Sequence, residues 1–429
     1  MTTETGHTPA PAAPAPTPRI LNSEYVWITA FAGPLATGVI GMVIAGNWAD
    51  RRGPVAPLYT AVAMFVVGLL VAGLAPSMEI LVLGRFAQGL GSGGLMVALY
   101  VVVARVYPQE LHPAIFAGFA AAWVIPSLIG PTIAGAVTEL WSWHWVFLGV
   151  VILVLVALLM VIPALRGLAN DGDASTPWAF GRLGWSVLAA VAVLALNLVG
   201  DIPGVGPVLA VVAVVVALIA VRPLVPRGTL RARRGLPSVI LVRGVAAAAF
   251  FGAQVYLPYL LTDRYDLSPT LAGLSLTGGA LAWSVSATVQ GRMGTRLSSV
   301  TAVRLGTILV LAGILLTVAT AGFRWDALMV AVAWVVAGVG MGLMSPRSSA
   351  LTLAMSTPAD QGFNSGAMTV ADSFGSAMAL AITGTLFTAL AAADPFLGVF
   401  VLAAVVAFAA AVLAPRIRVA VAGEAGAAA

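Results

Sequence analysis

Residues 46–54 read Gly46-Asn47-Trp48-Ala49-Asp50-Arg51-Arg52-Gly53-Pro54. Three charged side chains stand together here, in a chain in which only 9% of the residues are charged. One apolar run, residues 25–45, leads into this stretch, and another, residues 56–75, leads out of it. The pattern predicts two helices of membrane length joined by a tight loop. Two arginines in so short a loop indicate the cytoplasmic side of the membrane.

The composition of the whole chain favours the same class of protein. Hydrophobic residues make up 60% of the sequence, and the charged share is far below the roughly one quarter found in soluble domains. We therefore expect an all-α polytopic membrane protein, a multi-pass protein of the plasma membrane. The net charge of +5 comes from arginines, most of them in short loops, so the charge predicts membrane topology and no nucleic-acid partner.

Catalytic and cofactor chemistry find no support in the sequence. The chain contains no cysteine, which excludes disulfides, thiolate metal sites and cysteine nucleophiles. No metal-ligand cluster, nucleophile–base set or phosphate-binding loop stands out. We expect no enzyme activity, no cofactor and no metal site.

Thirteen apolar segments are long enough to cross ~30 Å of hydrocarbon. The predicted spans are 24–47, 55–75, 80–104, 112–137, 143–164, 184–200, 205–222, 238–261, 269–291, 302–321, 326–352, 362–390 and 394–415. With Arg51 and Arg52 inside, most other arginines also fall inside, and Arg243 is counted among them. Arg19, Arg264 and Arg324 fall outside. This asymmetry predicts a cytoplasmic C-terminus.

Glycines repeat between the two ends of the chain. Gly46 corresponds to Gly291 and Gly130 to Gly375, at an offset of about 245 residues, which indicates a duplicated fold. The run Gly89-x-Gly91-x-Gly93 likewise corresponds to Gly338-x-Gly340-x-Gly342. The predicted divisions are a disordered Pro/Ala tail at 1–21, a first helical half at 22–166, a linker with two extra spans at 167–236, a second half at 237–416 and a flexible tail at 417–429.

The same offset reveals a gap at the start of the chain. The partner of span 238–261 would fall in the Pro/Ala tail, which has no helical pattern. We therefore expect that the first half lacks its first span, and that the N-terminus lies outside.

Three motifs give the chain a family resemblance. Gly46, Asp50, Arg51 and Gly53 resemble the signature loop of the major facilitator superfamily, with Arg52 beside them. Residues 83–91, which contain Arg85, are similar to the buried-arginine motif of that family's fourth helix. Residues 123–135 are similar to the Gly-Pro antiporter motif, with Pro126, Gly130, Pro131 and Gly135 in place and Ala134 at a position usually held by glycine.

The resemblance implies a major facilitator fold of two pseudo-symmetric halves, here with two central linker helices as in the fourteen-span drug:proton antiporters. It also implies alternating access, a small amphiphilic substrate, and protons as the coupling ion. Asp50, Arg51 and Arg52, with Gly46 and Gly53, would form a conformational latch; otherwise they anchor the topology. We expect a monomer in the lipid bilayer.

Two charged side chains inside spans are the candidate transport residues. Arg85 shares a helix face with Gln88 and Ser92, and the resemblance implies a role in proton transfer or substrate binding. The alternative is an arginine satisfied by backbone carbonyls or reaching out to the interface. Asp372 lies deep in its span, where it could carry a proton, pair with a cationic substrate, or form only a structural hydrogen bond.

Further polar, aromatic or sulfur-bearing side chains in the spans are candidates for the lining of a binding cavity, although each one alone is more often a packing residue. They are Gln88, Ser92, Tyr100, Trp123, Gln254, Tyr256, Trp283, Asn364 and Met368. Export of amphiphilic compounds is the leading hypothesis. A facilitator that imports a sugar or metabolite, and a truncated membrane protein that does not transport, remain as alternatives.

Overall fold

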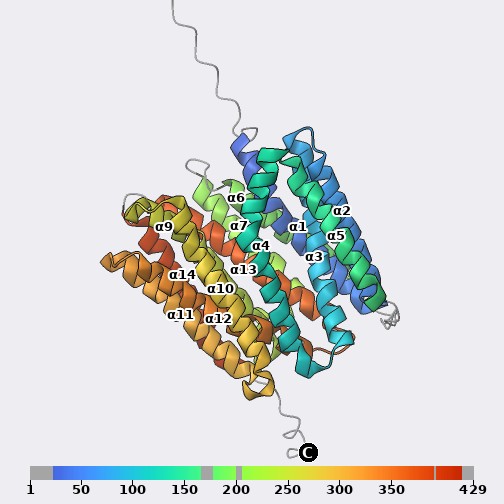
Figure 1. The fold of residues 1–429 in the computed structure, drawn as a ribbon. Coiled ribbons are helices and arrows are strands. Elements are labelled where there is room, and N and C mark those ends of the chain that lie inside the picture. Colours follow the sequence, from blue (N-terminus) through green and yellow to red (C-terminus); the bar gives the residue numbers. More distant parts are fainter. Residues whose placement is uncertain (1–22, 166–176, 200–204, 391–392, 418–429) are drawn as a thin grey trace, which may run out of the picture.

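The computed structural model describes residues 23–165, 177–199, 205–390 and 393–417, and these residues form α-helices and short 3₁₀ turns without a β-strand (Figure 1). The helices of the first half are α1 (Ser23–Arg52), α2 (Val55–Gly73), α3 (Met78–Val106), α4 (His112–Leu140) and α5 (His144–Leu165). The linker contributes α6 (Phe180–Val199) and α7 (Gly206–Val221). The second half comprises α8 (Leu236–Gln254), α9 (Tyr256–Tyr265), α10 (Pro269–Arg292), α11 (Ser299–Phe323), α12 (Leu328–Ala354), α13 (Gln361–Ala389) and α14 (Pro395–Leu413).

The membrane-spanning character of the fold is confirmed. Eight of the described helices are long and apolar enough to cross a membrane, with α8 and α9 counted as one broken helix, and α6 and α7 fall into two shorter apolar segments. Together with α1, α4 and α10, these helices occupy the positions of the thirteen expected spans. The expected absence of a span before α1 concerns residues outside the described part of the chain.

The same arrangement of packed helices recurs in both halves. In the first half α3 packs against α1 and α2, and in the second half α12 packs against α10 and α11. The matching glycine runs lie in these two central helices. Gly340 and Gly306 lie so close that a Cβ atom on either one would be 2.6 Å from the carbonyl oxygen of the other. Small residues at such positions let helix backbones touch.

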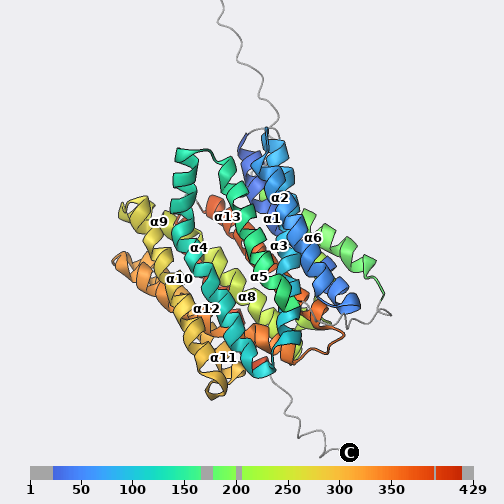
Figure 2. The ribbon, with the colours of Figure 1, turned by 45° about the vertical axis from the view of Figure 1, so that its right-hand side comes forward.

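The linker helices lie beside the bundle, where the two halves meet. Helix α6 packs against α1 and α7 (Figure 1), and side chains of α7 meet those of α13 in a shared apolar cluster. Figure 2 shows α6 beside α1 from another side. Val39 of α1, Ala217 of α7 and Phe374 of α13 belong to one buried apolar cluster. The linker is therefore an integral part of the bundle.

The stretch 46–54 ends α1 and turns the chain into α2. Gly53 has a positive φ of 79°, and its amide donates to the carbonyl oxygen of Ala49. Glycine adopts this left-handed conformation without the penalty of a Cβ atom, and Pro54 cannot continue a helix, so the helix ends here.

The closest contacts between the halves lie at the end of the bundle that carries Arg51, Arg105 and Arg292, which we call the arginine-rich end. Gly46 of α1 has no room for a Cβ atom against Gly362 of α13. Symmetrically, a Cβ atom on Gly291 of α10 would lie 3.0 Å from the Cβ atom of Ala117 in α4. The repeat that pairs Gly46 with Gly291 thus places both glycines at contacts between the halves.

Candidate functional site

A cavity of about 410 Å³ lies between the two halves. It is bounded by α3 of the first half and by α8, α10, α12 and α13 of the second. The side chains that line it are Met96, Tyr100, Arg243, Phe250, Phe251, Gln254, Leu276, Ala280, Trp283, Trp334, Met368, Thr369 and Asp372. A cavity that lies between duplicated halves is where transporters of this construction bind their substrates.

Aromatic rings form one wall of the cavity. The ring of Phe250 stacks on Trp334 at 4.5 Å between centroids and meets Trp283 edge-on at 5.4 Å. Trp334 is almost fully buried, which fixes the rings in position. Flat faces of this kind bind apolar and aromatic surfaces, and they also attract cations through the π-system.

An ion pair also lines the cavity and gives it a charged region beside the apolar rings. Arg243 Nε donates to Asp372 Oδ1 and Arg243 Nη2 donates to Asp372 Oδ2, each at 2.9 Å. The Arg243 side chain is 10% exposed and that of Asp372 is 28% exposed, so water reaches the carboxylate more than the guanidinium. Within the described residues, Arg243 Nη1 is buried without a hydrogen-bond partner.

The depth of this pair agrees with the expectation for Asp372. Asp372 lies eleven residues after the start of α13 at Gln361, which is ~16 Å at 1.5 Å per residue, near the middle of ~30 Å of hydrocarbon. Arg243, in contrast, was assigned to the cytoplasmic charges, and that assignment is wrong. It lies within α8, where it is buried and pairs with Asp372.

Some of the predicted cavity residues line this cavity and others do not. Tyr100, Gln254, Trp283 and Met368 line it. Asn364 does not: it is buried one turn nearer the start of α13 than Met368, and its side-chain amide donates to Ser356 Oγ at 2.9 Å. Tyr256 also lies elsewhere, stacked on Phe387 at 5.1 Å, because the break between α8 and α9 redirects the chain.

The residues around Arg85 lie on the cavity-facing stripe of α3 but outside the cavity itself. Gln88 and Ser92 are followed at intervals of four by Met96 and Tyr100, which line the cavity. Arg85 donates from Nη1 to Gln88 Oε1 at 2.6 Å, and Ser92 Oγ donates to the carbonyl of Gly89. Arg85 lies ~16 Å nearer the start of α3 than Met96, and its role in transport stays a prediction.

The side chain of Asp50, in the last turn of α1, contacts the start of α13. Asp50 Oδ1 accepts the amide hydrogen of Gly362 at 2.7 Å, and Oδ2 accepts that of Phe363 at 2.9 Å. These are free N–H groups at the start of α13, where a helix favours negative charge. The contact joins the two halves at the arginine-rich end.

Burial changes the acidity of this carboxyl group. Asp50 lies past the end of the apolar run 25–45 and is only 5% exposed. Its burial raises the pKa of Asp50 to about 7, although the two backbone N–H bonds favour the ionised form. The guanidinium of Arg51 lies over the ring of Trp178, 5.2 Å from its centroid, and Arg52 is exposed. Their part in a latch stays a prediction.

Residues of the Gly-Pro motif lie in α4, whose helix is continuous from His112 to Leu140. The side-chain positions of Trp123, Pro126 and Pro131, and the surroundings of Gly130 and Gly135, are outside what the structure describes. Their roles stay predictions.

A second buried arginine was missed by sequence analysis. Arg347 of α12 donates from Nη2 to the carbonyls of Gln290 and Gly294, each at 2.9 Å, and from Nε to Gln290 Oε1. Its guanidinium thereby supplies hydrogen-bond donors to carbonyl oxygens at the C-terminal end of α10. It does not line the central cavity. The position of Arg243 and Arg347 inside apolar spans was itself a usable signal, because an arginine in hydrocarbon requires partners. Among the described residues, no group of three or more His, Asp or Glu side chains is arranged to hold a metal ion.

A duplicated helical bundle with a polar and aromatic cavity between its halves defines the class of membrane transporters that are built from internal repeats. The sequence model of the Major Facilitator Superfamily matches this chain twice, over residues 8–251 and 239–427, and the chain belongs to that superfamily. The first match covers the first half, the linker and most of α8, and the second match covers the second half from α8 onward.

Known relatives include drug exporters. The multidrug efflux pump SdrM of Staphylococcus aureus is 25% identical over 245 residues, which cover 53% of this chain and 52% of SdrM. The probable multidrug-efflux transporter Rv1634 of Mycobacterium tuberculosis is 32% identical over 149 residues, 34% of this chain and 31% of that protein. The chain spans about half the length, or less, of these curated relatives.

Solved structures share the fold. A bacterial homologue of the iron transporter ferroportin, in its outward-facing state, superposes with a TM-score of 0.69 at 12% identity, covering 92% of this chain and 91% of that one. At this identity the likeness concerns the fold alone.

Proposed function

We propose that this protein exports small amphiphilic compounds across the plasma membrane by alternating access, in exchange for protons. The observation that carries the proposal is the cavity between the halves, which is lined both by aromatic rings and by the Arg243–Asp372 ion pair. The multidrug efflux pumps among the relatives support the same direction of transport.

The cavity suits flat molecules with one polar group. Phe250, Trp283 and Trp334 offer apolar faces, while Arg243 and Asp372 offer one charge of each sign. A substrate cation can compete with Arg243 for the Asp372 carboxylate, and a substrate acid can compete with Asp372 for the Arg243 guanidinium. The aromatic wall leaves little room for the many hydrogen bonds that a sugar requires.

Asp372 is the proposed proton carrier. When its carboxylate binds a proton, the attraction to Arg243 weakens, and the contact between α8 and α13 can rearrange. Deprotonation restores the ion pair. Proton binding and substrate binding at the same carboxylate would couple the two fluxes.

The Asp50 contact is the proposed latch of the closed arginine-rich end. If that end is cytoplasmic, as the arginine asymmetry predicts, the described conformation is closed to the cytoplasm, and the cavity is to be reached from outside. Opening toward the cytoplasm requires that Asp50 leave the start of α13.

Transport by reconstituted protein tests the proposal. Purified protein in liposomes with an imposed pH gradient should move ethidium, a flat cation, and should move protons in the opposite direction. Asp372→Asn should abolish the proton-driven flux. Asp263→Asn, which changes an exposed acid outside the cavity, serves as the matched control and should leave the flux unchanged.

The same assay separates the alternatives. Uptake of a sugar driven only by its own gradient, without ethidium flux, would favour a facilitator. Folded protein that moves none of these compounds would favour a membrane protein without transport activity. Equal proton-driven flux in the Asp372→Asn variant would contradict the role of Asp372.

A further inference from the structure

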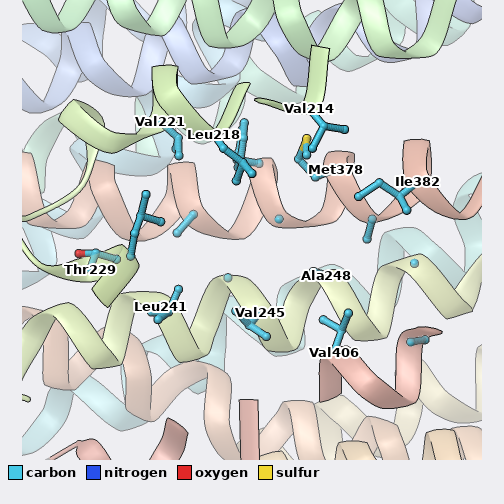
Figure 3. A pocket seen from close by; sticks show the side chains of 18 of the residues that line it. Val214, Leu218, Val221, Thr229, Leu241, Val245, Ala248, Met378, Ile382 and Val406 are labelled. Carbon is cyan, nitrogen blue, oxygen red and sulfur yellow. The ribbon is translucent and has the colours of Figure 1, made fainter. Parts of the chain in front are cut away.

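A second cavity, of about 310 Å³, lies on the side of the second half away from the central site (Figure 3). Helices α7 and α13 form one wall, and α8 and α14 form the other. Figure 3 shows Leu218 and Met378 facing Leu241 and Val245 across an elongated space. We call this space the lateral pocket.

The lateral pocket offers almost only hydrocarbon to an occupant. The hydroxyl groups of its two threonines are satisfied internally: Thr229 donates to the carbonyl of Pro226 and Thr383 to that of Ala379. Its rim opens to the membrane, because Leu218, Leu230 and Ile382 line it and remain 44%, 48% and 38% exposed. An apolar molecule can therefore enter from the bilayer.

The length of the pocket matches one leaflet. Along α8 it extends from Leu241 to Gly252, eleven residues, or ~16 Å at 1.5 Å per residue. Half of a ~30 Å hydrocarbon core is ~15 Å. One acyl chain that runs from the membrane surface to the bilayer middle has the length of this pocket.

Positive charge gathers at the end of the pocket that carries Thr229 and Leu230. The loop 222–235 contains five arginines and no acidic residue. All five are exposed, and neither ion pair found among the described residues involves them: Arg222, Arg227, Arg231, Arg233 and Arg234. We call this segment the arginine loop.

The backbone of the arginine loop is tightly folded, which keeps the charges in place. Gly228 and Gly235 have φ of 92° and 90°, and Ala232 adopts a left-handed conformation at φ 49°. The carbonyl of Ala232 accepts a hydrogen bond from Arg416 at 3.2 Å. The arginines therefore stand at the mouth of an apolar slot at membrane-surface depth.

We propose that the lateral pocket binds one acyl chain of an anionic phospholipid, whose phosphate lies on the arginine loop. The hydrocarbon walls, the length of one leaflet and the uncompensated positive charge at one end together describe this molecule. The pocket is separate from the central cavity, with α8 and α13 between them: Arg243 and Asp372 line the central cavity, while Gly244 and Ala371 line the lateral pocket. The proposal does not depend on the transport function.

Native mass spectrometry of the detergent-purified protein tests this site. Phosphatidylglycerol and phosphatidylcholine with identical acyl chains are added in turn, and the lipid adducts that survive are counted. Wild-type protein should retain phosphatidylglycerol in preference to phosphatidylcholine. Arg231→Gln, Arg233→Gln and Arg234→Gln combined should lower that preference about tenfold or more, since each arginine adds to anionic-lipid attraction. The matched control, Arg292→Gln with Arg296→Gln, changes two exposed arginines elsewhere at the same end and should retain the preference.

A second set of variants tests the acyl slot. Ala248→Trp should fill the pocket and remove the adduct, whereas Val405→Trp, on a lipid-facing site of α14 outside the pocket, should not. Leu218→Trp at the rim repeats the test without placing bulk between α8 and α13. Circular dichroism and gel filtration show that each variant is folded.

Four results would overturn the proposal, the first three of which concern the lipid adducts alone. These are adducts of both lipids at equal levels in wild-type protein, adducts that survive both pocket-filling substitutions, and adducts lost equally in the control variants. Loss of ethidium binding without loss of lipid in Ala248→Trp would assign the pocket to drugs instead, and would equally overturn it.

Discussion

Arg243 and Asp372 hold each other in the wall of the central cavity through two parallel hydrogen bonds. A buried ion pair of this geometry contributes little net stability, but each partner is costly when left alone. The unpaired Nη1 of Arg243 adds to that cost. The contribution of these two side chains to stability is therefore best measured by changing both of them as well as each one alone.

Removing one partner should destabilise the protein, and removing both should restore much of the loss. We expect Asp372→Leu alone and Arg243→Met alone to lower the free energy of unfolding by about 3 kcal/mol each. The double variant should fall within about 1 kcal/mol of wild type. The free energy of unfolding of the wild type, the two single variants and the double variant is measured by titration from a mild detergent into a denaturing one. Additive losses in the double variant would show that the pair is not coupled.

At the scale of elements, glycines determine how closely the helices pack. The effect of adding a methyl group should change sign with position. Gly340→Ala should destabilise the protein by about 1–3 kcal/mol, because the new Cβ atom would lie 2.6 Å from the carbonyl oxygen of Gly306.

Gly273→Ala, in contrast, meets no atom within 4 Å and should stabilise the protein by about 0.5–1 kcal/mol. Thermal unfolding of the purified variants compares the two. Equal effects at both positions would show that close approach does not decide the packing.

The Asp50 contact between α1 and α13 should make stability depend on pH. The pKa of Asp50 is about 7 in the folded protein and near 3.8 when unfolded, so the folded form holds a proton that the unfolded form releases between these values. This contribution is fully present below pH 3.8 and is lost as the pH rises through 7. It amounts to at most about 4 kcal/mol.

The wild type should therefore gain stability from pH 8 to pH 5 relative to Asp50→Asn, as measured by thermal unfolding midpoints. Two nearby charges also act on the pKa of Asp50: Asp360 raises it, and Arg105 lowers it. Glu110→Gln, which changes an exposed acid at the same end, is the control and should keep the wild-type slope. An unchanged slope in Asp50→Asn would place the titration elsewhere.

At the scale of the whole molecule, the halves meet at the arginine-rich end, and a covalent bond there should hold that end closed. Gly291→Cys with Ala117→Cys places two Cβ atoms near the separation that a disulfide requires, and the chain has no other cysteine. Oxidation of this pair should abolish ethidium transport in liposomes, and reduction should restore it. Each single-cysteine variant is the control. Full transport by the oxidised protein would mean that this contact need not open.

The membrane-spanning class, the duplicated halves, the linker spans and the signature loop could be predicted from the sequence. Long apolar runs have one stable environment, and the charges between them bias orientation. The period of a helix also identifies residues that share a face. Gln88 and Ser92 share one face of α3, and Met368 and Asp372 share one face of α13. It does not tell how far a cavity extends along that face, which is why Asn364 was predicted to line it and does not.

By itself, the amino-acid sequence determined that this chain would cross a membrane many times as two related halves. Only the tertiary structure decided which charges meet: Arg243 and Asp372 are 129 residues apart, and Asp50 and Gly362 are 312 apart. The reason is that hydrophobicity specifies the length and environment of each helix, whereas its rotation and its neighbours are set by packing against the other helices.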